Sequence, residues 1–278
     1  MGQKGWKYYN NAAIPSGAPH EVPDLSVIET GEVWHLFSSK PLLARWTTDY
    51  DCEEQTGWWY IVKDEPFDIS KLKAKRRYVI NKGLKNFKIE IINPLDNAKK
   101  LFEITVAATQ SYPKKQRPKL NYESFKKNIE SWTVHKVYGA FSIETGDLCG
   151  YALVGFYDAY IDFTSLKVIP EYEKQCINAA LVCGILYDIE PLLQNGIYIC
   201  DGARNINHTT AFQDYLESYF DFRKAYAKLH IEYNPKVRWI VKMAYPLRCL
   251  LKPFRFIKLV DKFVSVLKME AIIREENF

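Results

Sequence analysis

Three strand-length runs in direct succession limit most strongly how this chain can fold. Residues 136–143, 148–157 and 160–168 are rich in aromatic and β-branched side chains. A polar turn that contains Gly146 separates the first two runs, and a two-residue connection separates the second and third. Runs of this length with turn residues between them are typical of β-hairpins. The sequence therefore predicts a three-stranded antiparallel meander.

A helix and a buried strand are predicted after the meander. Pro170 is typical of the first turn of a helix, and apolar side chains then recur every four residues on one face up to Leu193. Asn195-Gly196 ends this helix, and the apolar run 197–200 predicts a buried strand. A helix over 209–219 and a strand over 222–231 complete the order β-β-β-α-β-α-β.

The part of the chain before the meander divides into shorter elements. The first thirty residues contain three prolines and predict an extended arm. Short strands are expected over 33–37, 42–47, 57–62 and 87–92. A helix capped by Ser70 is expected to end near Gly83, and two more helices are expected over 97–111 and 122–132.

The order of elements resembles that of the GNAT acyltransferase superfamily, in which two neighbouring strands part and hold the acyl donor. There, a Q/R-x-x-G-x-G/A turn binds the pyrophosphate of coenzyme A through N–H groups at a helix N-terminus. Residues 175–180 match this pattern at Gln175 and Ala180 and depart from it at Asn178. Asparagine tolerates positive φ, so the turn is expected to survive, but the departure puts coenzyme A in question. The alternative is that these residues only begin a helix.

A second stretch, 207–222, is similar to the N-x-x-A…Y…G-F helix and strand that close the GNAT domain, with Asp221 where glycine is usual. The resemblance implies that Tyr215 or Tyr219 is the general acid. The polar residues 201–208 follow a buried strand, which is typical of a binding loop. Arg204 and Asn207 are therefore candidates for holding the acyl donor.

Residues 68–83 are similar to the S-x-K-x-R-R-x-I-x-K-G helix of the Fem-like branch, whose members have doubled or partly doubled acyltransferase folds. This branch includes enzymes that pass amino acids from aminoacyl-tRNA to cell-wall precursors. The resemblance implies an α+β fold with a mixed sheet, in which 1–66 is a partial first half-domain made of an arm and short strands. Residues 67–235 would be the GNAT-like domain, and 236–278 a basic, amphipathic helical tail.

Acyl transfer to an amine requires a neutral amine, hydrogen-bond donors for the oxyanion and an acid for the leaving group. Backbone N–H groups over 163–166 would supply the donors. Asp162, Asp201 and His208 are the candidate bases, because binding groups gather at strand ends in open sheets. The structural alternatives are that Asp162 faces solvent, that Asp201 belongs to a turn, and that His208 caps a helix.

Cations are concentrated in two segments, although the net charge of the chain is only +5. Residues 71–88 hold eight Lys or Arg and no acid. On this helix Lys73, Arg76 and Arg77 are expected to contact tRNA phosphates if the donor is aminoacyl-tRNA, or the nucleotide of an acyl-CoA donor. The alternative is a solvated helix face. The five histidines never fall at the short spacings of a metal site, so no metal is expected.

The tail from 236 to 278 combines ten cations with an apolar helical stripe that includes Phe256, Val260 and Leu267. A basic amphipathic helix can lie on an anionic membrane surface. It can also pack its apolar face on the main domain, and packing is the favoured interpretation.

The composition is that of a globular protein, and no apolar run reaches the length of a membrane-spanning helix. We therefore expect a cytoplasmic protein, either free or peripheral to the inner face of the membrane. The favoured function is transfer of an acyl or aminoacyl group to an amine of a cell-envelope or surface-polysaccharide precursor. One alternative is an acetyl-CoA-dependent N-acetyltransferase acting on a soluble amine, and the other is a non-catalytic binding protein that retains the fold.

Overall fold

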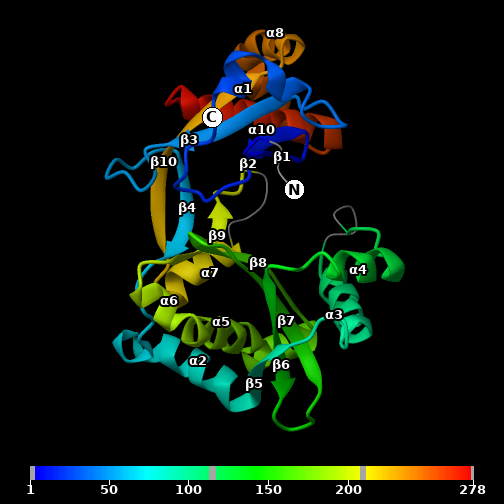
Figure 1. Ribbon diagram of the computed structural model, residues 1–278, viewed down its shortest axis with the longest axis vertical. Coiled ribbons are helices and arrows are strands. Elements are labelled where there is room, and N and C mark those ends of the chain that lie inside the picture. Colours follow the sequence, from blue (N-terminus) through cyan, green and yellow to red (C-terminus); the bar gives the residue numbers. More distant parts are fainter. Residues whose placement is uncertain (1–3, 113–116, 207–210, 277–278) are drawn as a thin grey trace. The chain divides into compact units, whose positions relative to one another are not determined.

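A computed structural model describes residues 4–112, 117–206 and 211–276 (Figure 1). The chain forms two compact units, and it passes between them more than once. The terminal unit contains residues 1–61, 202–211 and 224–278, and the central unit contains residues 62–201 and 212–223. The division into a partial half-domain over 1–66, a GNAT-like domain over 67–235 and a helical tail over 236–278 stays a prediction.

The terminal unit is built on a mixed sheet with the strand order β1-β2-β3-β10-β4. Strand β1 pairs antiparallel with β2, β2 pairs parallel with β3, and β3 pairs antiparallel with β10. The strands are β1 (Trp6–Tyr9), β2 (Ala12–Pro15), β3 (Leu43–Thr48), β4 (Trp58–Lys63) and β10 (Arg223–Tyr233). Strand β4 ends in the central unit, and β10 begins there.

Both faces of this sheet are covered, because successive side chains of a strand point to opposite faces. Ala12 and Leu43 belong to a core formed with the C-terminal helices. Their neighbours Ala13 and Ala44 belong to a second core, formed with the helical turns α1 (Ser26–Glu29) and η1 (Glu32–Trp34).

The predicted arm is wrong, because β1 and β2 form a hairpin with the ring of Trp6 fully buried beneath it. The strand expected over 33–37 is also wrong. A 3-10 turn occupies Glu32–Trp34 instead, and it buries Val33 and Trp34 on the same side of the chain.

The C-terminal helices of the terminal unit are α8 (Pro235–Ala244), α9 (Arg248–Leu251) and α10 (Lys258–Ile273), joined by the turns η5 (Tyr245–Leu247) and η6 (Lys252–Phe254). Val264 and Leu267 of α10 are fully buried. This end of the tail therefore packs on its own unit, as the favoured interpretation expected. No helix in the described ranges is both long and apolar enough to span a bilayer.

The central unit is built on a five-stranded part of the sheet, in the order β9-β8-β7-β6-β5. The predicted meander is confirmed, since β6, β7 and β8 pair antiparallel in chain order, and β5 adds antiparallel to β6. Strand β9 pairs parallel with β8. The bounds are β5 (Phe87–Ile92), β6 (His135–Ser142), β7 (Leu148–Phe156), β8 (Tyr160–Val168) and β9 (Tyr198–Ala203), whose last two residues lie in the terminal unit.

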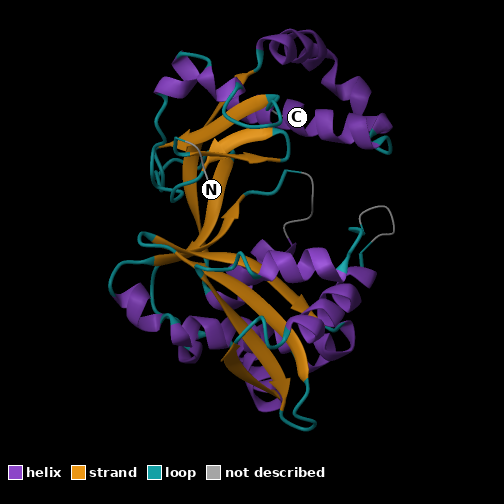
Figure 2. Ribbon diagram, turned by 45° about the vertical axis from the view of Figure 1, so that its right-hand side comes forward, coloured by secondary structure: helices purple, strands orange, loops and turns teal. Residues whose placement is uncertain are grey.

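Helices cover both faces of the central sheet (Figure 2). On one face the hydroxyl groups of Tyr151 on β7 and Thr105 on α3 lie 2.7 Å apart. The neighbouring Gly150 faces Ile177 of α5 on the other side. Helix α4 packs on α3, and α2 packs on α5. The helices are α2 (Ala74–Asn86), α3 (Ala98–Gln110), α4 (Tyr122–Ile129), α5 (Ile177–Asp188), α6 (Glu190–Gln194) and α7 (Ala211–Phe220).

Two helix starts differ from those predicted. Asp68, and not Ser70, caps the turn before α2, where its carboxylate accepts a hydrogen bond from the Ser70 N–H group. The helix expected from Pro170 to Leu193 is interrupted at Cys176, whose φ of 65° is left-handed. A 3-10 segment η4 (Pro170–Gln175) precedes this residue, and α5 follows it.

Candidate functional site

Strands β8 and β9 pair over only three residues of each strand. Tyr160, Ile161 and Asp162 face Tyr198, Ile199 and Cys200. Beyond Asp162, the edge of β8 over residues 163–168 has no strand partner within the described part of the central unit. We call this unpaired edge, together with Asp201 of β9, the β8–β9 opening. Its N–H groups are available for a ligand because no ladder uses them.

A β-bulge on β8 coincides with the opening. Leu153 of β7 faces Ser165, while Val154 faces Phe163, so Thr164 is the extra residue. Bulges re-aim side chains and are common beside active sites. The Thr164 hydroxyl donates a 2.7 Å hydrogen bond to the Asp162 carboxylate and so fixes the carboxylate at the last paired position.

Asp201 follows the last paired residue of β9 and lies in the central unit. The pKa of its carboxyl group is raised to about 7, chiefly by burial. A hydrogen bond from Gln213 opposes this rise, and the nearby charge of Asp162 contributes to it. A carboxyl group with a pKa near neutrality can accept a proton at the pH where the protein works. Of the three predicted bases, the structure thus brings Asp162 and Asp201 together, whereas His208 lies outside the described residues.

Sequence reasoning did not identify two polar residues near these carboxylates. Gln213 of α7 is buried and hydrogen-bonds Asp201. His135 opens β6 and lies in register with Gly155 of β7, which in turn faces Asp162. Burial lowers the pKa of His135, and its Nδ1 atom is buried without a hydrogen-bond partner in the described structure. No local sequence signal marks either residue, since each reaches the site only through pairing or packing.

Helix α7 contributes aromatic rings on the same side of the central unit. The Phe212 ring lies 5.5 Å from the ring of Phe163 on β8, and 6.2 Å from that of Tyr215. Burial raises the pKa of Tyr215, and the neighbouring thiol of Cys176 adds to this effect. Tyr215 therefore lies near Phe212, which contacts β8, and near Cys176 at the start of α5. Its raised pKa keeps it protonated at neutral pH. The Tyr219 ring packs against the Tyr215 ring in a tilted arrangement, with 4.9 Å between the ring centroids.

The start of α5 is held by α2. Lys82 and Asn86 of α2 donate hydrogen bonds to the carbonyl groups of Lys174 and Gln175, at 2.8 and 3.2 Å. A Cβ atom on Gly83 would lie 2.5 Å from the Cys176 carbonyl oxygen and 3.0 Å from the Ala180 nitrogen. Glycine at 83 and a small residue at 180 are therefore needed for this close helix packing.

The expected place of the positive φ is wrong. Cys176 has the left-handed conformation, whereas Asn178 lies within the first turn of α5. The first N–H groups of a helix have no intrahelical acceptor. No side chain caps them in α5. The Oδ1 atom of Asn178 is buried and has no partner in the described structure. The role of Gln175, Asn178 and Ala180 in binding a cofactor stays a prediction.

The cationic side chains of α2 and of the turn before it are on the surface of the central unit. Lys73 and Arg77 are exposed and Arg76 is half-buried. Arg77 donates a 3.0 Å hydrogen bond to the Ser70 carbonyl group. For Lys73 and Arg76 the described residues provide no ion-pair partner, so both charges are available to an anion.

One of the predicted cofactor-binding residues is not in the central unit. Arg204 belongs to the terminal unit, where its backbone N–H donates to the Trp59 carbonyl group at 2.8 Å and its guanidinium donates to the Gly57 carbonyl group. Asn207 lies outside the described residues. Within the described ranges, no three His, Cys, Asp or Glu side chains gather as they would in a metal site.

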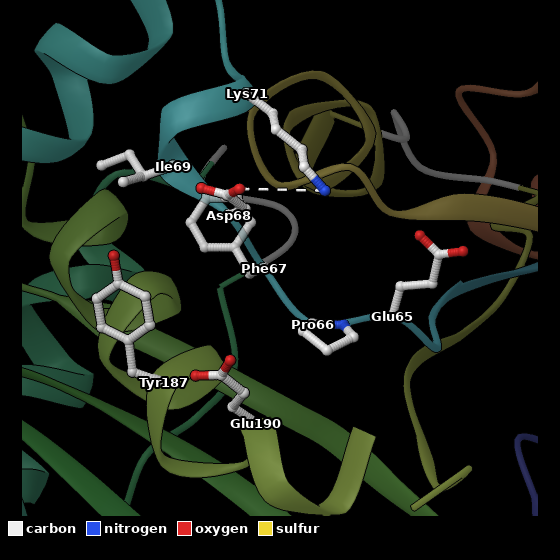
Figure 3. Close-up of a pocket in the computed structure, with 8 residues that line it drawn as sticks. All are labelled: Glu65, Pro66, Phe67, Asp68, Ile69, Lys71, Tyr187 and Glu190. Carbon is white, nitrogen blue, oxygen red and sulfur yellow. Dashed lines mark ion pairs between the residues drawn. The ribbon is translucent and has the colours of Figure 1, made fainter. Parts of the chain in front are cut away.

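A cavity of about 530 Å³ lies elsewhere in the central unit (Figure 3). Its lining has three carboxylates and two aromatic rings, and Lys71 pairs with Asp68 at 4.0 Å on its rim. None of the residues of the β8–β9 opening lines it, so the cavity is a separate feature. The lining residues are Glu65, Pro66, Phe67, Asp68, Ile69, Lys71, Tyr187 and Glu190.

No family model and no curated protein matches the sequence. The structure nevertheless resembles solved structures. FemX aligns with a TM-score of 0.57 at 8% identity, over 85% of this chain and 85% of its own. L-PGS from Bacillus licheniformis aligns with a TM-score of 0.53 at 12% identity, over 86% of this chain and 83% of its own. The predicted mixed-sheet α+β fold is confirmed: the chain has a GNAT-like fold of the Fem-like kind.

Proposed function

We propose that this protein transfers an aminoacyl group from aminoacyl-tRNA to an amine of a cell-envelope or surface-polysaccharide precursor. The observation that carries the proposal is the position of Asp201. A carboxyl group whose pKa is raised to about 7 lies where β8 and β9 part, beside an edge of unpaired backbone. A base next to unused N–H donors suits attack of an amine on a carbonyl group.

In the proposed reaction, the Asp201 carboxylate takes a proton from the ammonium group of the acceptor. The neutral nitrogen then attacks the ester carbonyl carbon, a C–N bond forms, and the carbonyl electrons move onto oxygen. Backbone N–H groups over residues 163–166 hold this oxyanion. When the tetrahedral intermediate collapses, the C–O bond to the tRNA ribose breaks. The leaving oxygen receives the proton of Tyr215, and the nitrogen gives up its second proton to solvent. Asp201 then releases the proton that it took and Tyr215 regains one, so that one proton is released overall.

The cationic side chains of α2 and its preceding turn support tRNA as the donor. Lys73, Arg76 and Arg77 lie at the beginning of α2, the helix whose other end holds the start of α5, so they could bind phosphates of a donor that extends along this helix. Each phosphate that such a cation neutralises releases counterions, which makes binding sensitive to salt. Charged tRNA is made in the cytoplasm, so the proposal also assigns the protein to that compartment.

A second candidate is an acyl-CoA-dependent N-acyltransferase. The uncapped start of α5 favours it, because free N–H groups at a helix N-terminus bind pyrophosphate. The first turn holds Asn178 where the GNAT pattern has glycine, and this side chain occupies buried space beside those N–H groups. For that reason the thioester donor is the less favoured of the two.

Donor binding by the full chain would distinguish these two functions from that of a protein that retains the fold without transferase activity. We expect charged tRNA to raise the melting temperature and to bind less tightly as salt rises, with a smaller salt slope in the Lys73→Gln, Arg76→Gln, Arg77→Gln variant. The matched control replaces the exposed Lys99, Lys126 and Lys127 with Gln. Stabilisation by coenzyme A and acetyl-CoA alone would favour the second candidate, and no effect of any donor would contradict both.

Catalysis is tested by incubating the protein with radiolabelled aminoacyl-tRNA and amine-bearing envelope precursors. The expected product carries the label in an amide bond that survives mild alkali, which hydrolyses the aminoacyl ester of the donor. Label transfer that the Asp201→Asn variant performs as fast as the natural protein would remove Asp201 from the mechanism.

A further inference from the structure

Between the middle of α8 and the start of α10, the terminal unit exposes many large apolar side chains. Trp239 is 67% exposed, Met243 74% and Phe256 73%. Clusters of this kind on a folded unit usually mark an interaction site. We call residues 239–259 the exposed apolar segment, and its exposed members are Trp239, Ile240, Met243, Leu247, Leu250, Phe254, Phe256, Ile257 and Leu259.

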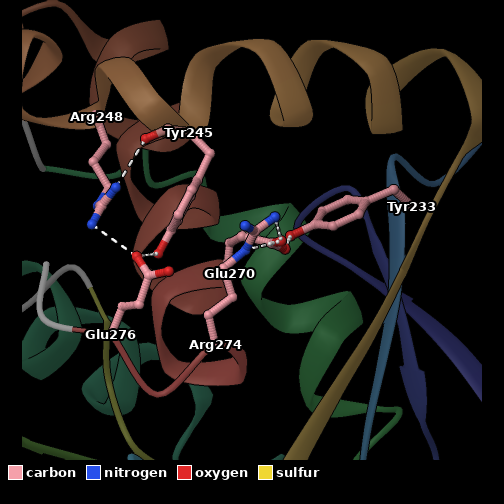
Figure 4. A network of polar contacts seen from close by, with 6 residues as sticks. All are labelled: Tyr233, Tyr245, Arg248, Glu270, Arg274 and Glu276. Atoms are coloured by element: carbon pink, nitrogen blue, oxygen red, sulfur yellow. Dashed lines mark hydrogen bonds and ion pairs between the residues drawn. The ribbon is translucent and has the colours of Figure 1, made fainter.

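The segment is held firmly in the fold. Val241 and Tyr245, which alternate with the exposed residues, are buried in the core of the terminal unit. The Tyr245 hydroxyl donates to Glu276 at 2.9 Å, and the Arg248 and Arg274 guanidinium groups both lie 4.3 Å from the Tyr245 ring centroid (Figure 4). The exposure is therefore a property of the folded unit.

The same network fixes α10 beneath the segment. Tyr233 of β10 donates a 2.7 Å hydrogen bond to Glu270, and the Arg274 guanidinium donates to the other oxygen of that carboxylate at 2.9 Å (Figure 4). Tyr233 and Glu270 thereby join the last helix to the sheet. Removal of the chain after Pro235 would take away Val241, Tyr245 and Leu267 from the core, so point substitutions are the appropriate probes.

The exposed apolar segment and the residues on either side of it carry charge of one sign. Residues 234–260 contain seven Lys or Arg and no Asp or Glu. Among these cations, Arg238 pairs with Glu232, Arg248 with Glu276 and Arg255 with Asp261, all of them acids outside this range. The formal charge of the range itself is +7, and it stays positive when these three carboxylates are included. The Lys242 ammonium lies 5.6 Å from the centroid of the exposed Trp239 ring, which places positive charge directly beside apolar surface.

We propose that the exposed apolar segment is a docking surface for a bilayer that contains anionic lipids. Aromatic and aliphatic side chains interleaved with cations suit the boundary between acyl chains and anionic headgroups. A second copy of the chain fits less well, because a two-fold interface would bring the same positive segment against itself. Since no described helix can span a bilayer, the segment lies on the membrane surface.

The test is co-sedimentation of the full chain with vesicles of phosphatidylcholine, with and without 30 mol% phosphatidylglycerol, at low and high salt. We expect binding only to the anionic vesicles, and weaker binding at high salt. The Lys236→Glu, Lys242→Glu variant and the Trp239→Ser, Met243→Ser, Phe256→Ser variant should each bind at least tenfold more weakly. Circular dichroism and melting temperature establish that both variants are folded.

Matched controls change the same numbers of exposed residues elsewhere in the terminal unit. Lys7→Glu, Lys40→Glu serves for charge, and Tyr9→Ser, Val22→Ser, Leu42→Ser serves for apolar surface; both should bind like the natural chain. Equal losses in controls and test variants, or no binding to anionic vesicles, would overturn the proposal. So would a vesicle-independent dimer that the Trp239→Ser, Met243→Ser, Phe256→Ser variant abolishes.

This proposal is independent of the transfer reaction. All of the substituted residues are in the terminal unit, whereas Asp201, Tyr215 and the unpaired edge of β8 are in the central unit. With a soluble acceptor, the variants should therefore react at the natural rate. Loss of vesicle binding with retained transfer supports the docking surface, and retained vesicle binding without any transfer contradicts only the proposed function.

Discussion

Asp162 and Cys200 are the last residues paired between β8 and β9. The next residue of β9, Asp201, has a carboxyl pKa raised to about 7 by burial and by the nearby Asp162. The parting of two strands and the perturbed carboxyl group thus occur at one place in the central unit.

Asp201 should control the pH dependence of transfer. A base with a pKa of about 7 is half-deprotonated at that pH, so kcat/KM should rise between about pH 6 and 8 and then level off. The Asp201→Asn variant should lose roughly 10²- to 10⁴-fold in rate, together with this rising limb. Initial rates from pH 5.5 to 9 check both effects.

Asp162→Asn is the informative companion variant. It removes the negative charge that helps to raise the pKa of Asp201, so the rising limb should move to lower pH. Asp158→Asn, at an exposed position after β7, should leave the profile unchanged. If the rising limb of the kcat/KM profile stays at the same pH in the Asp162→Asn variant, the two carboxyl groups are not coupled.

Asp201 should also make stability depend on pH. Its pKa is higher in the folded than in the unfolded chain, so its contribution to stability is complete below about pH 4 and is lost as pH rises through 7. Relative to the natural chain, Asp201→Asn should gain up to about 4 kcal/mol over that range. Urea unfolding at pH 4, 6 and 8 measures the gain, and parallel stability profiles would contradict it.

Tyr215 should act as the acid for the leaving oxygen, and Tyr219 should not. Tyr215→Phe keeps the ring that packs against Phe212 but removes the proton, so the single-turnover rate should fall by roughly 10²-fold or more. Tyr219→Phe, one turn further along α7, should stay close to the natural rate. Equal losses in the two variants would assign the effect to packing of the rings.

Gly83 should be required for the packing of α2 on α5. Alanine normally stabilises a helix by about 1 kcal/mol relative to glycine, but here its Cβ atom would lie 2.5 Å from the Cys176 carbonyl oxygen. We expect Gly83→Ala to destabilise the chain by about 1–3 kcal/mol. The exposed Asn81→Ala substitution in the same helix is the control, and its effect on urea unfolding should be small or stabilising.

Sequence reasoning predicted the central sheet well because local rules determine it. The bounds of β5 and β8 coincide with those expected, since turn residues flank short, strongly β-forming runs. The β1–β2 hairpin was missed, although Asn10 and Asn11, both with positive φ, form the kind of turn that joins antiparallel strands. The two-unit organisation has no local signal, because it depends on the pairing of β10 with the distant β3.

The candidate site was predictable only in part. The positions of Asp162 and Asp201 followed from strand ends, whereas the contact of Gln213 with Asp201 depends on how α7 packs. The left-handed Cys176 could not be expected from its residue type. Close packing on Gly83 and hydrogen bonds from Lys82 and Asn86 to the neighbouring carbonyl groups hold that turn.

The most direct test is a crystal structure of the full chain with a non-hydrolysable aminoacyl-adenosine analogue of the tRNA acceptor end. We predict that the analogue's carbonyl oxygen lies about 3 Å from a backbone nitrogen of residues 163–166, with the β8 edge otherwise unpaired. An analogue bound away from β8, or β9 paired with β8 along its whole length in the complex, would contradict the account.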